Sequence, residues 1–131
     1  MCDGIALESI RLIAEWLPVA FADGNNLEAR SHMLVASSMA AVAFQKGLGA
    51  VHGLSEPIGA VYDTQHGLTN AVLLPYVLRA NQHAIEAKCE LIARYLALPG
   101  APGNEYGAVL DWVESLCNQL EIPHSLKEIG V

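Results

Sequence analysis

A chain of 131 residues with a net charge of −7 fits one domain and is too acidic for a typical nucleic-acid-binding protein. Its seven Lys and Arg residues are scattered along the sequence, which excludes both a nucleic-acid interface and a basic helix on a membrane surface. Hydrophobic residues make up 53% of the chain and charged residues only 16%, so we expect it to bury apolar surface against a partner, either a second copy or a missing domain.

Helical periodicity runs through the whole chain, and strand patterns are nearly absent. The apolar spacing predicts a first helix over about Asp3–Leu17, which Pro18 ends. Asn25 is the predicted cap of a second helix over Leu27–Lys46, with Glu28 in capping-box position. Many small side chains in the middle of this second helix predict that it is the buried, central one.

Between residues 47 and 67 the sequence becomes rich in glycine and loses its helical periodicity. Five glycines interrupt this stretch and Pro57 disfavours helix before it, so we expect an irregular segment that serves a site or packs tightly. Further helices are predicted over His66–Ala80, with a bend near Pro75, and over residues 84–98 and 105–120. Ser125 is expected to cap a short terminal piece. Together these elements predict an all-α helical bundle that forms a single domain over residues 1–131.

The cysteines and the apolar windows indicate the compartment. Cys2, Cys89 and Cys117 are odd in number, far apart and without a CxxC pair, as expected for free thiols rather than for disulfides or a zinc site. The most apolar window, Met33–Phe44, has 12 residues, whereas a membrane span needs about 20. The N-terminus has no signal-peptide pattern. We therefore expect a soluble, cytoplasmic protein.

Two of the five histidines are candidates for a site. His52 and His66 lie in the glycine-rich segment, fourteen positions apart (66 − 52), and each precedes a Gly that would let the backbone approach a bound atom or a packed neighbour. Neutral imidazole is the commonest side-chain ligand for divalent transition metals. Two histidines do not fill a coordination shell, and this spacing matches no short zinc signature, so simple packing of both rings stays open. We expect His83 and His124 to be solvated and His32 to be a core or interface residue.

The run from Gly47 to Asn81, GLGAVHGLSEPIGAVYDTQHGLTNAVLLPYVLRAN, resembles the signature region of iron-containing (group III) alcohol dehydrogenases. Cys2–Arg30 resembles the helix and turn that precede this signature in the family, and Leu120–Val131 resembles the segment that follows it. The similarity covers essentially the whole chain. It implies the all-helical, dehydroquinate synthase-like C-terminal domain of that family.

The resemblance also implies a metal site and a reaction. In that family one Asp and three His hold iron or zinc, and two of the three histidines match His52 and His66 here. The metal polarises the alcohol oxygen, and a hydride passes to NAD(P), so the implied activity interconverts an alcohol with an aldehyde or ketone.

Several family features are missing or changed. The other two ligands belong to an upstream Asp-x-x-x-His motif, and no Asp of this chain has His four residues later. The nucleotide-binding domain is absent as well, so we expect a truncated chain that is inactive alone, and no catalytic or cofactor-binding residue is assigned. Glu56 stands where many members have His; it either offers a carboxylate oxygen to the metal or is a solvated acid. Gln65 replaces a common Pro, which we expect to be a minor change.

An alternative reading is not enzymatic. A truncated relic could persist as a non-catalytic helical homo-oligomer with a vestigial metal site or with none. Two chains that meet near His52 and His66 would then provide a four-His site.

Overall fold

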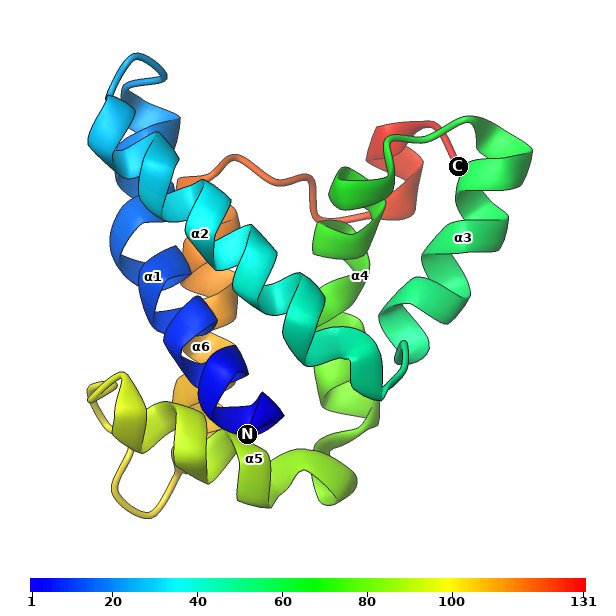
Figure 1. Cartoon of the computed structure of the whole chain (residues 1–131). Helices are drawn as coiled ribbons and strands as arrows, with labels where there is room; N and C mark the ends of the chain where they lie inside the picture. The colour runs from blue at the N-terminus through cyan, green and yellow to red at the C-terminus, as the bar shows by residue number, and fades with distance from the viewer. The chain divides into compact units, whose positions relative to one another are not determined.

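The computed structural model describes residues 1–131, except for the side chain of Lys46, and its backbone is all-helical, as predicted (Figure 1). No strand occurs in the backbone of residues 1–131. The elements are α1 (Cys2–Ala22), α2 (Leu27–Ala43), η1 (Phe44–Lys46), α3 (Ala50–Tyr62), α4 (His66–Ala80), α5 (Gln82–Tyr95), α6 (Glu105–Gln119) and η2 (Leu126–Ile129), where η marks a 3-10 helix. Within the described residues, no helix has both the length and the apolar character needed to cross a bilayer.

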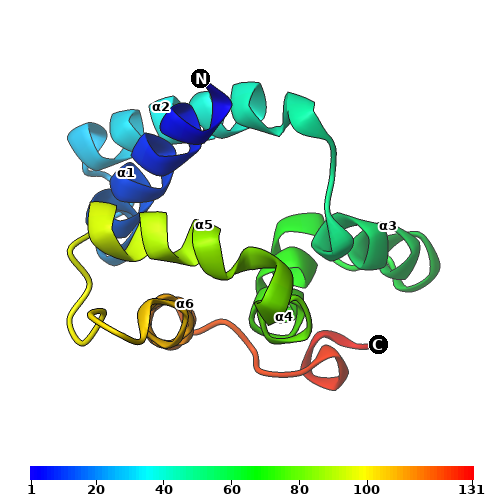
Figure 2. The same cartoon turned by 90° about the horizontal axis from the view of Figure 1, so that it is seen from below.

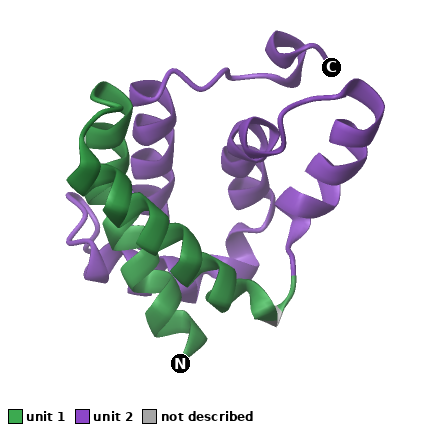
Figure 3. Cartoon of the chain, turned by 45° about the horizontal axis from the view of Figure 1, so that its top comes forward, with its two compact units in different colours: residues 1–47 green, residues 48–131 purple. Residues whose placement is uncertain are grey.

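The helices form two compact units, Met1–Gly47 and Leu48–Val131, which Figure 3 distinguishes by colour. The first unit is a hairpin of α1 and α2, joined by a short turn at residues 23–26. Its interface is built from small and polar side chains: Ala29 and Ala36 are fully buried, and the buried Ser9 hydroxyl donates to the Ala36 carbonyl at 2.8 Å. Small residues at these positions let the two backbones approach closely.

An aromatic stack also joins α1 to α2. The ring of His32 lies on the ring of Trp16 with centroids 4.3 Å apart and an interplanar angle of 13°. The prediction that His32 is a core or interface histidine is therefore confirmed.

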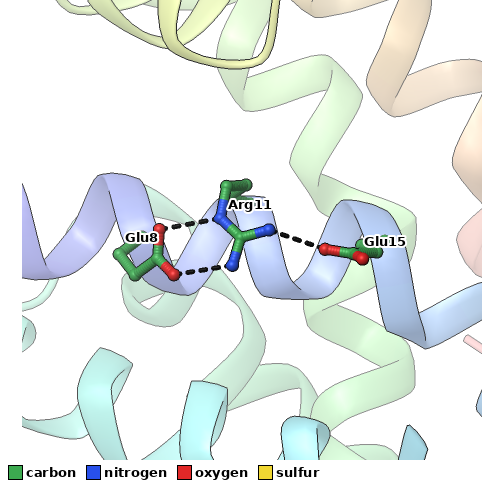
Figure 4. Close-up of polar contacts among 3 residues, drawn as sticks. All are labelled: Glu8, Arg11 and Glu15. Atoms are coloured by element: carbon green, nitrogen blue, oxygen red, sulfur yellow. Dashed lines mark hydrogen bonds and ion pairs between the residues drawn. The ribbon is translucent and has the colours of Figure 1, made fainter.

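The outward face of α1 carries an ion-pair network (Figure 4). Arg11 donates from Nε and Nη2 to the two carboxylate oxygens of Glu8, at 2.8 and 2.7 Å, and from Nη1 to Glu15 at 2.6 Å. The partners stand three and four residues away, the spacing at which side chains of a helix meet. Because all three groups are partly or largely exposed, the network stabilises the helix only slightly.

Three sequence predictions for the first unit are wrong. Helix α1 does not stop at Pro18 but continues to Ala22, because one missing N–H removes a single hydrogen bond and the following residues resume the pattern. The cap of α2 is Asn26, whose side chain accepts from Ala29 N at 3.0 Å, while Asn25 lies in the turn. Helix α2 is not wholly buried: many of its small and apolar residues are exposed, including Ser37, Ser38 and Ala41.

The second unit contains α3 to α6 and η2, and α5 and α6 pack against each other in it (Figure 2). Its buried cluster lies on α5, α6 and the turn between them. The buried members of that cluster are Cys89, Ala93, Ala101, Ala108 and Val109. Two tyrosines tie other segments to α4: Tyr106 donates to the Leu78 carbonyl at 3.2 Å, and Tyr76 donates to the His124 carbonyl at 2.5 Å. An ion pair between Arg79 and Glu114 joins α4 to α6.

The main correction to the sequence predictions concerns residues 47–67, which we expected to be irregular. Most of this segment is the helix α3. Pro57 lies inside this helix, and the residue four positions earlier is Gly53, so no side chain adds to the crowding around the proline ring. Packing against α4 offsets the low helix propensity of the glycines. The breaks are confined to residues 47–49, where Gly47 has φ 117°, and to residues 63–65, where Asp63 is left-handed with φ 54°. Helix α5 is likewise shifted from the predicted 84–98 to Gln82–Tyr95, since Ala97 is left-handed.

Candidate metal centre

His52 and His66 lie close together in the second unit, although they belong to two different helices. His52 is the third residue of α3 and His66 is the first residue of α4. Their ring centroids are 5.3 Å apart, and the ring planes are inclined at 47°. His52 is half-buried and His66 is exposed, so the pair lies at the surface of the second unit rather than in separate apolar pockets.

The turn between α3 and α4 is fixed by polar side chains of its own sequence. The Gln65 side chain caps α4 by accepting from Leu68 N at 2.5 Å. The fully buried Thr69 hydroxyl lies 2.8 Å from the Thr64 hydroxyl and 3.1 Å from the Gln65 carbonyl oxygen. These contacts hold the first turn of α4, which carries His66. Gln65 therefore has a structural role that its residue type does not indicate, because Gln is an uncommon helix cap.

The glycines that follow the two histidines differ in their surroundings. A Cβ added to Gly53 would meet nothing within 4 Å, so the expected close neighbour is absent there among the described atoms. A Cβ on Gly67 would lie 3.3 Å from the Gln65 amide oxygen that caps α4. Only Gly67 therefore has a local reason to lack a side chain.

A contact that the sequence reasoning missed joins His66 to Asn70, one turn further along α4. The Asn70 amide Nδ2 lies 3.0 Å from His66 Nε2. The Asn70 carbonyl Oδ1 is buried and has no hydrogen-bond partner among the described residues. Asn70 and His52 also line a groove of about 460 Å³, whose other lining is mainly apolar and includes Leu74 and Ile85. The i, i+4 spacing of His66 and Asn70 is the available sequence signal.

The spacing of the two imidazoles fits a shared divalent cation. A metal–nitrogen distance of about 2.1 Å, plus ~1.2 Å from each nitrogen to its ring centre, places two tetrahedral imidazole ligands with centroids roughly 5 Å apart. The observed 5.3 Å matches that separation. Among the described residues, no group of three or more His, Cys, Asp or Glu side chains gathers in one place. Exposed Glu56 thus does not join His52 and His66 as a third ligand.

The other candidate residues lie away from this pair. His83 and His124 are exposed, as predicted, although His83 lies within α5 rather than in a turn. The three cysteines are free thiols, as predicted. Burial is the main cause that raises the pKa of Cys117, and the negative charge of Glu114 adds to it. Burial likewise raises the pKa of Cys89, with a smaller contribution from the charge of Glu86.

The whole chain matches one family model. Residues 1–131 match the model described as "Fe-containing alcohol dehydrogenase family, C-terminal". Similar curated proteins include alcohol dehydrogenase 4 of Saccharomyces cerevisiae, 39% identical over 132 residues, and 1,3-propanediol dehydrogenase of Citrobacter freundii, 38% identical over 133 residues. Each alignment covers 98% of this chain but 34% of the relative.

Solved structures give the same result. A crystal structure of 1,3-propanediol oxidoreductase superposes with a TM-score of 0.93 at 37% identity, covering 99% of this chain and 35% of that one. Sulfoacetaldehyde reductase from Bifidobacterium kashiwanohense, solved in complex with NAD+, gives a TM-score of 0.83 at 27% identity, covering 100% of this chain and 34% of that one. This chain therefore spans about a third of the length of the proteins it matches.

Proposed function

The chain belongs to the Fe-containing alcohol dehydrogenase family, and on that premise we propose that it is the helical, metal-binding part of an NAD(P)-linked alcohol oxidoreductase. In this proposal His52 and His66 hold one divalent cation, iron or zinc, through imidazole nitrogens. The observation that carries the proposal is the 5.3 Å separation of the two rings, which suits two ligands of one ion.

The residues of the chain have defined roles in this function. The Gln65 cap and the Thr69 hydroxyl fix the start of α4 and thereby the position of the His66 ring. His52 lies in the first turn of α3, with its ring close to the His66 ring. When bound, the cation would act as a Lewis acid that polarises the oxygen of an alcohol or carbonyl substrate. The nicotinamide cofactor would accept or donate the hydride.

We further propose that the nucleotide site comes from a partner, either a nucleotide-binding domain or another chain. The relatives are about three times as long as this chain, and one similar structure is described with NAD+. Large apolar side chains on the surface support a partner: Leu27 is 77% exposed and Leu34 71% exposed in the first unit, and Val61 is 74% exposed in the second. Leu27 and Leu34 stand seven residues apart and therefore share one face of α2, and an exposed apolar helix face is a surface that can bind a partner.

Calorimetric titration with Zn²⁺ and Fe²⁺ (the latter without oxygen) tests the metal site. We expect the chain to bind one cation, and His52→Ala and His66→Ala each to weaken binding by about tenfold or more, because each removes a ligand nitrogen. His83→Ala is the matched control: it removes an exposed histidine on α5 and should leave binding unchanged.

The stoichiometry separates the two arrangements left open by the sequence. One cation per chain is expected for a site within one molecule, and one per two chains would indicate that two copies share a four-His site. Equal, weak binding by the unmodified chain and all three variants would contradict the proposal.

A further inference from the structure

Helix α2 has a second apolar face, opposite the one that packs on α1. The inner face is buried at Ala29 and Ala36. On the opposite side, six exposed residues share an arc of about 100° around the helix axis and form what we call the outer strip: Leu27, Ser31, Leu34, Val35, Ser38 and Val42. Its four large apolar side chains are all at least half exposed, which leaves the strip open to a partner.

The two serines add no free hydrogen-bond donor to the outer strip. The Ser31 hydroxyl donates to the Leu27 carbonyl at 2.7 Å, and the Ser38 hydroxyl donates to the Leu34 carbonyl at 3.0 Å. Both bonds stay within α2, so a second helix can cover the strip without leaving either donor unpaired. The small serine side chains also let that helix approach closely.

The order of residues along the outer strip is the same from either end. It runs large apolar, Ser, large apolar, large apolar, Ser, large apolar, and its centre lies between Leu34 and Val35. A contact between two identical chains about a two-fold axis needs a surface that is complementary to itself. Two antiparallel α2 helices centred there place Ser31 of one chain opposite Ser38 of the other, and large apolar side chains opposite each other.

The charges of α2 also favour an antiparallel pair. Glu28 and Arg30 are the only acidic or basic side chains among Asp, Glu, Lys and Arg on this helix, and they flank the outer strip. In the antiparallel pair the two Glu28 lie about 20 Å apart along the axis and the two Arg30 about 14 Å apart. Both separations exceed the screening length of about 8 Å at physiological ionic strength. A parallel pair would set each of these charges beside its own copy.

We propose that the outer strip of α2 binds the outer strip of a second copy of this chain, antiparallel, about a two-fold axis between Leu34 and Val35. Two α1–α2 hairpins would then form a four-helix arrangement. The contact belongs to one helix of 17 residues per chain, so it is small and the dimer is reversible. This inference does not depend on the metal site.

Sedimentation equilibrium of the full chain tests the dimer. We expect the unmodified chain to shift from monomer towards dimer between about 1 and 300 μM. Leu34→Glu places one carboxylate of each chain next to the axis and should weaken the association by about a hundredfold or more. Val61→Glu is the matched control, because Val61 is 74% exposed, as Leu34 is 71% exposed, but belongs to the second unit; it should leave the association unchanged.

Disulfide cross-linking tests the register. A mixture of Ser31→Cys and Ser38→Cys chains should form a disulfide between chains under mild oxidation, because the two positions face each other. Neither variant alone should do so, because the two copies of one position lie about 10 Å apart along the axis, and a disulfide joins Cα atoms less than about 7 Å apart. The unmodified chain measures any cross-linking by its three native free cysteines.

Each outcome decides for or against the proposal. An unmodified chain that stays monomeric up to about 300 μM overturns it and leaves the outer strip to another segment of a longer protein. Unchanged association of Leu34→Glu, or equal cross-linking in the mixture and in the single variants, also overturns it. Circular dichroism checks that each variant is folded, and if Leu34→Glu is not, the cross-linking result decides.

Discussion

Single hydroxyl and amide groups fix the start of α4, where His66 lies. Thr69 is fully buried, and its hydroxyl contacts both the Thr64 hydroxyl and the Gln65 carbonyl, so the start of α4 has little freedom. Asn70 contacts the His66 ring from one turn away. All these contacts are made by polar side chains between residues 64 and 70, so local sequence holds the first turn of α4 in place.

Cys117 provides a pH-dependent test at the same scale. Burial, and then the carboxylate of Glu114, raises the pKa of this thiol above its ordinary value of about 8.5. Because the folded chain holds the proton more tightly, stability should fall as pH rises through the raised pKa. Alkylation of Cys117 by iodoacetamide, followed by mass spectrometry, should therefore show its midpoint at higher pH in the folded chain than in urea.

Glu114→Gln should lower that midpoint. The change removes the carboxylate that disfavours the thiolate and also frees the positive charge of Arg79, which pairs with Glu114. Glu105→Gln, at the other end of α6, is the control and should leave the midpoint unchanged. A midpoint that is identical in Glu114→Gln and the unmodified chain would show that the carboxylate has no such effect.

At the scale of elements, residue type alone does not decide which residue caps a helix. The two adjacent asparagines before α2 are both acceptable caps by residue type, but the structure uses Asn26. The N–H of Asn25 instead donates to the Asp23 carboxylate at 2.9 Å in the turn. The side chain of Asn26 alone therefore satisfies a free N–H of α2.

Asn26→Ala should lower the free energy of unfolding of the first unit by about 1 kcal/mol, whereas Asn25→Ala should change it by less than about 0.5 kcal/mol. Urea unfolding followed by Trp16 fluorescence in a Trp112→Phe background measures this unit, because Trp16 lies on α1 and Trp112 on α6. Equal effects of the two substitutions would contradict the assignment of the cap.

At the scale of the whole molecule, a chain that spans about a third of its relatives is expected to depend on the remainder for nucleotide binding. The alignments cover nearly the full length of this chain, and the 1,3-propanediol oxidoreductase structure superposes on it with a TM-score of 0.93. A helical part that is this similar in backbone should be exchangeable between members of the family.

A chimera in which this chain replaces the aligned third of the Citrobacter freundii 1,3-propanediol dehydrogenase should oxidise an alcohol with formation of NADH. His66→Ala in the chimera should reduce kcat/KM by about a hundredfold or more, equivalent to about 2.7 kcal/mol. The unfused chain with NAD, metal and alcohol should give no NADH. A chimera that folds, binds NAD and retains the metal but has no activity would argue against the proposed function.

The all-helical class followed from the amino-acid pattern, because apolar residues recur at helical spacing from Ile5 onward and such spacing buries one face whatever the neighbours are. The histidine pair was recognisable from its glycine-rich setting, but its proximity needed the tertiary structure, because His52 and His66 both lie in the first turn of their own helix and their separation depends on how α3 packs on α4. The helical state of residues 50–62 did not follow: Gly53, Pro57 and Gly59 argue against helix locally, and packing against α4 outweighs them. The pairing of His66 with Asn70 and the unpaired Oδ1 also needed coordinates, because burial of one atom depends on every segment folded around it.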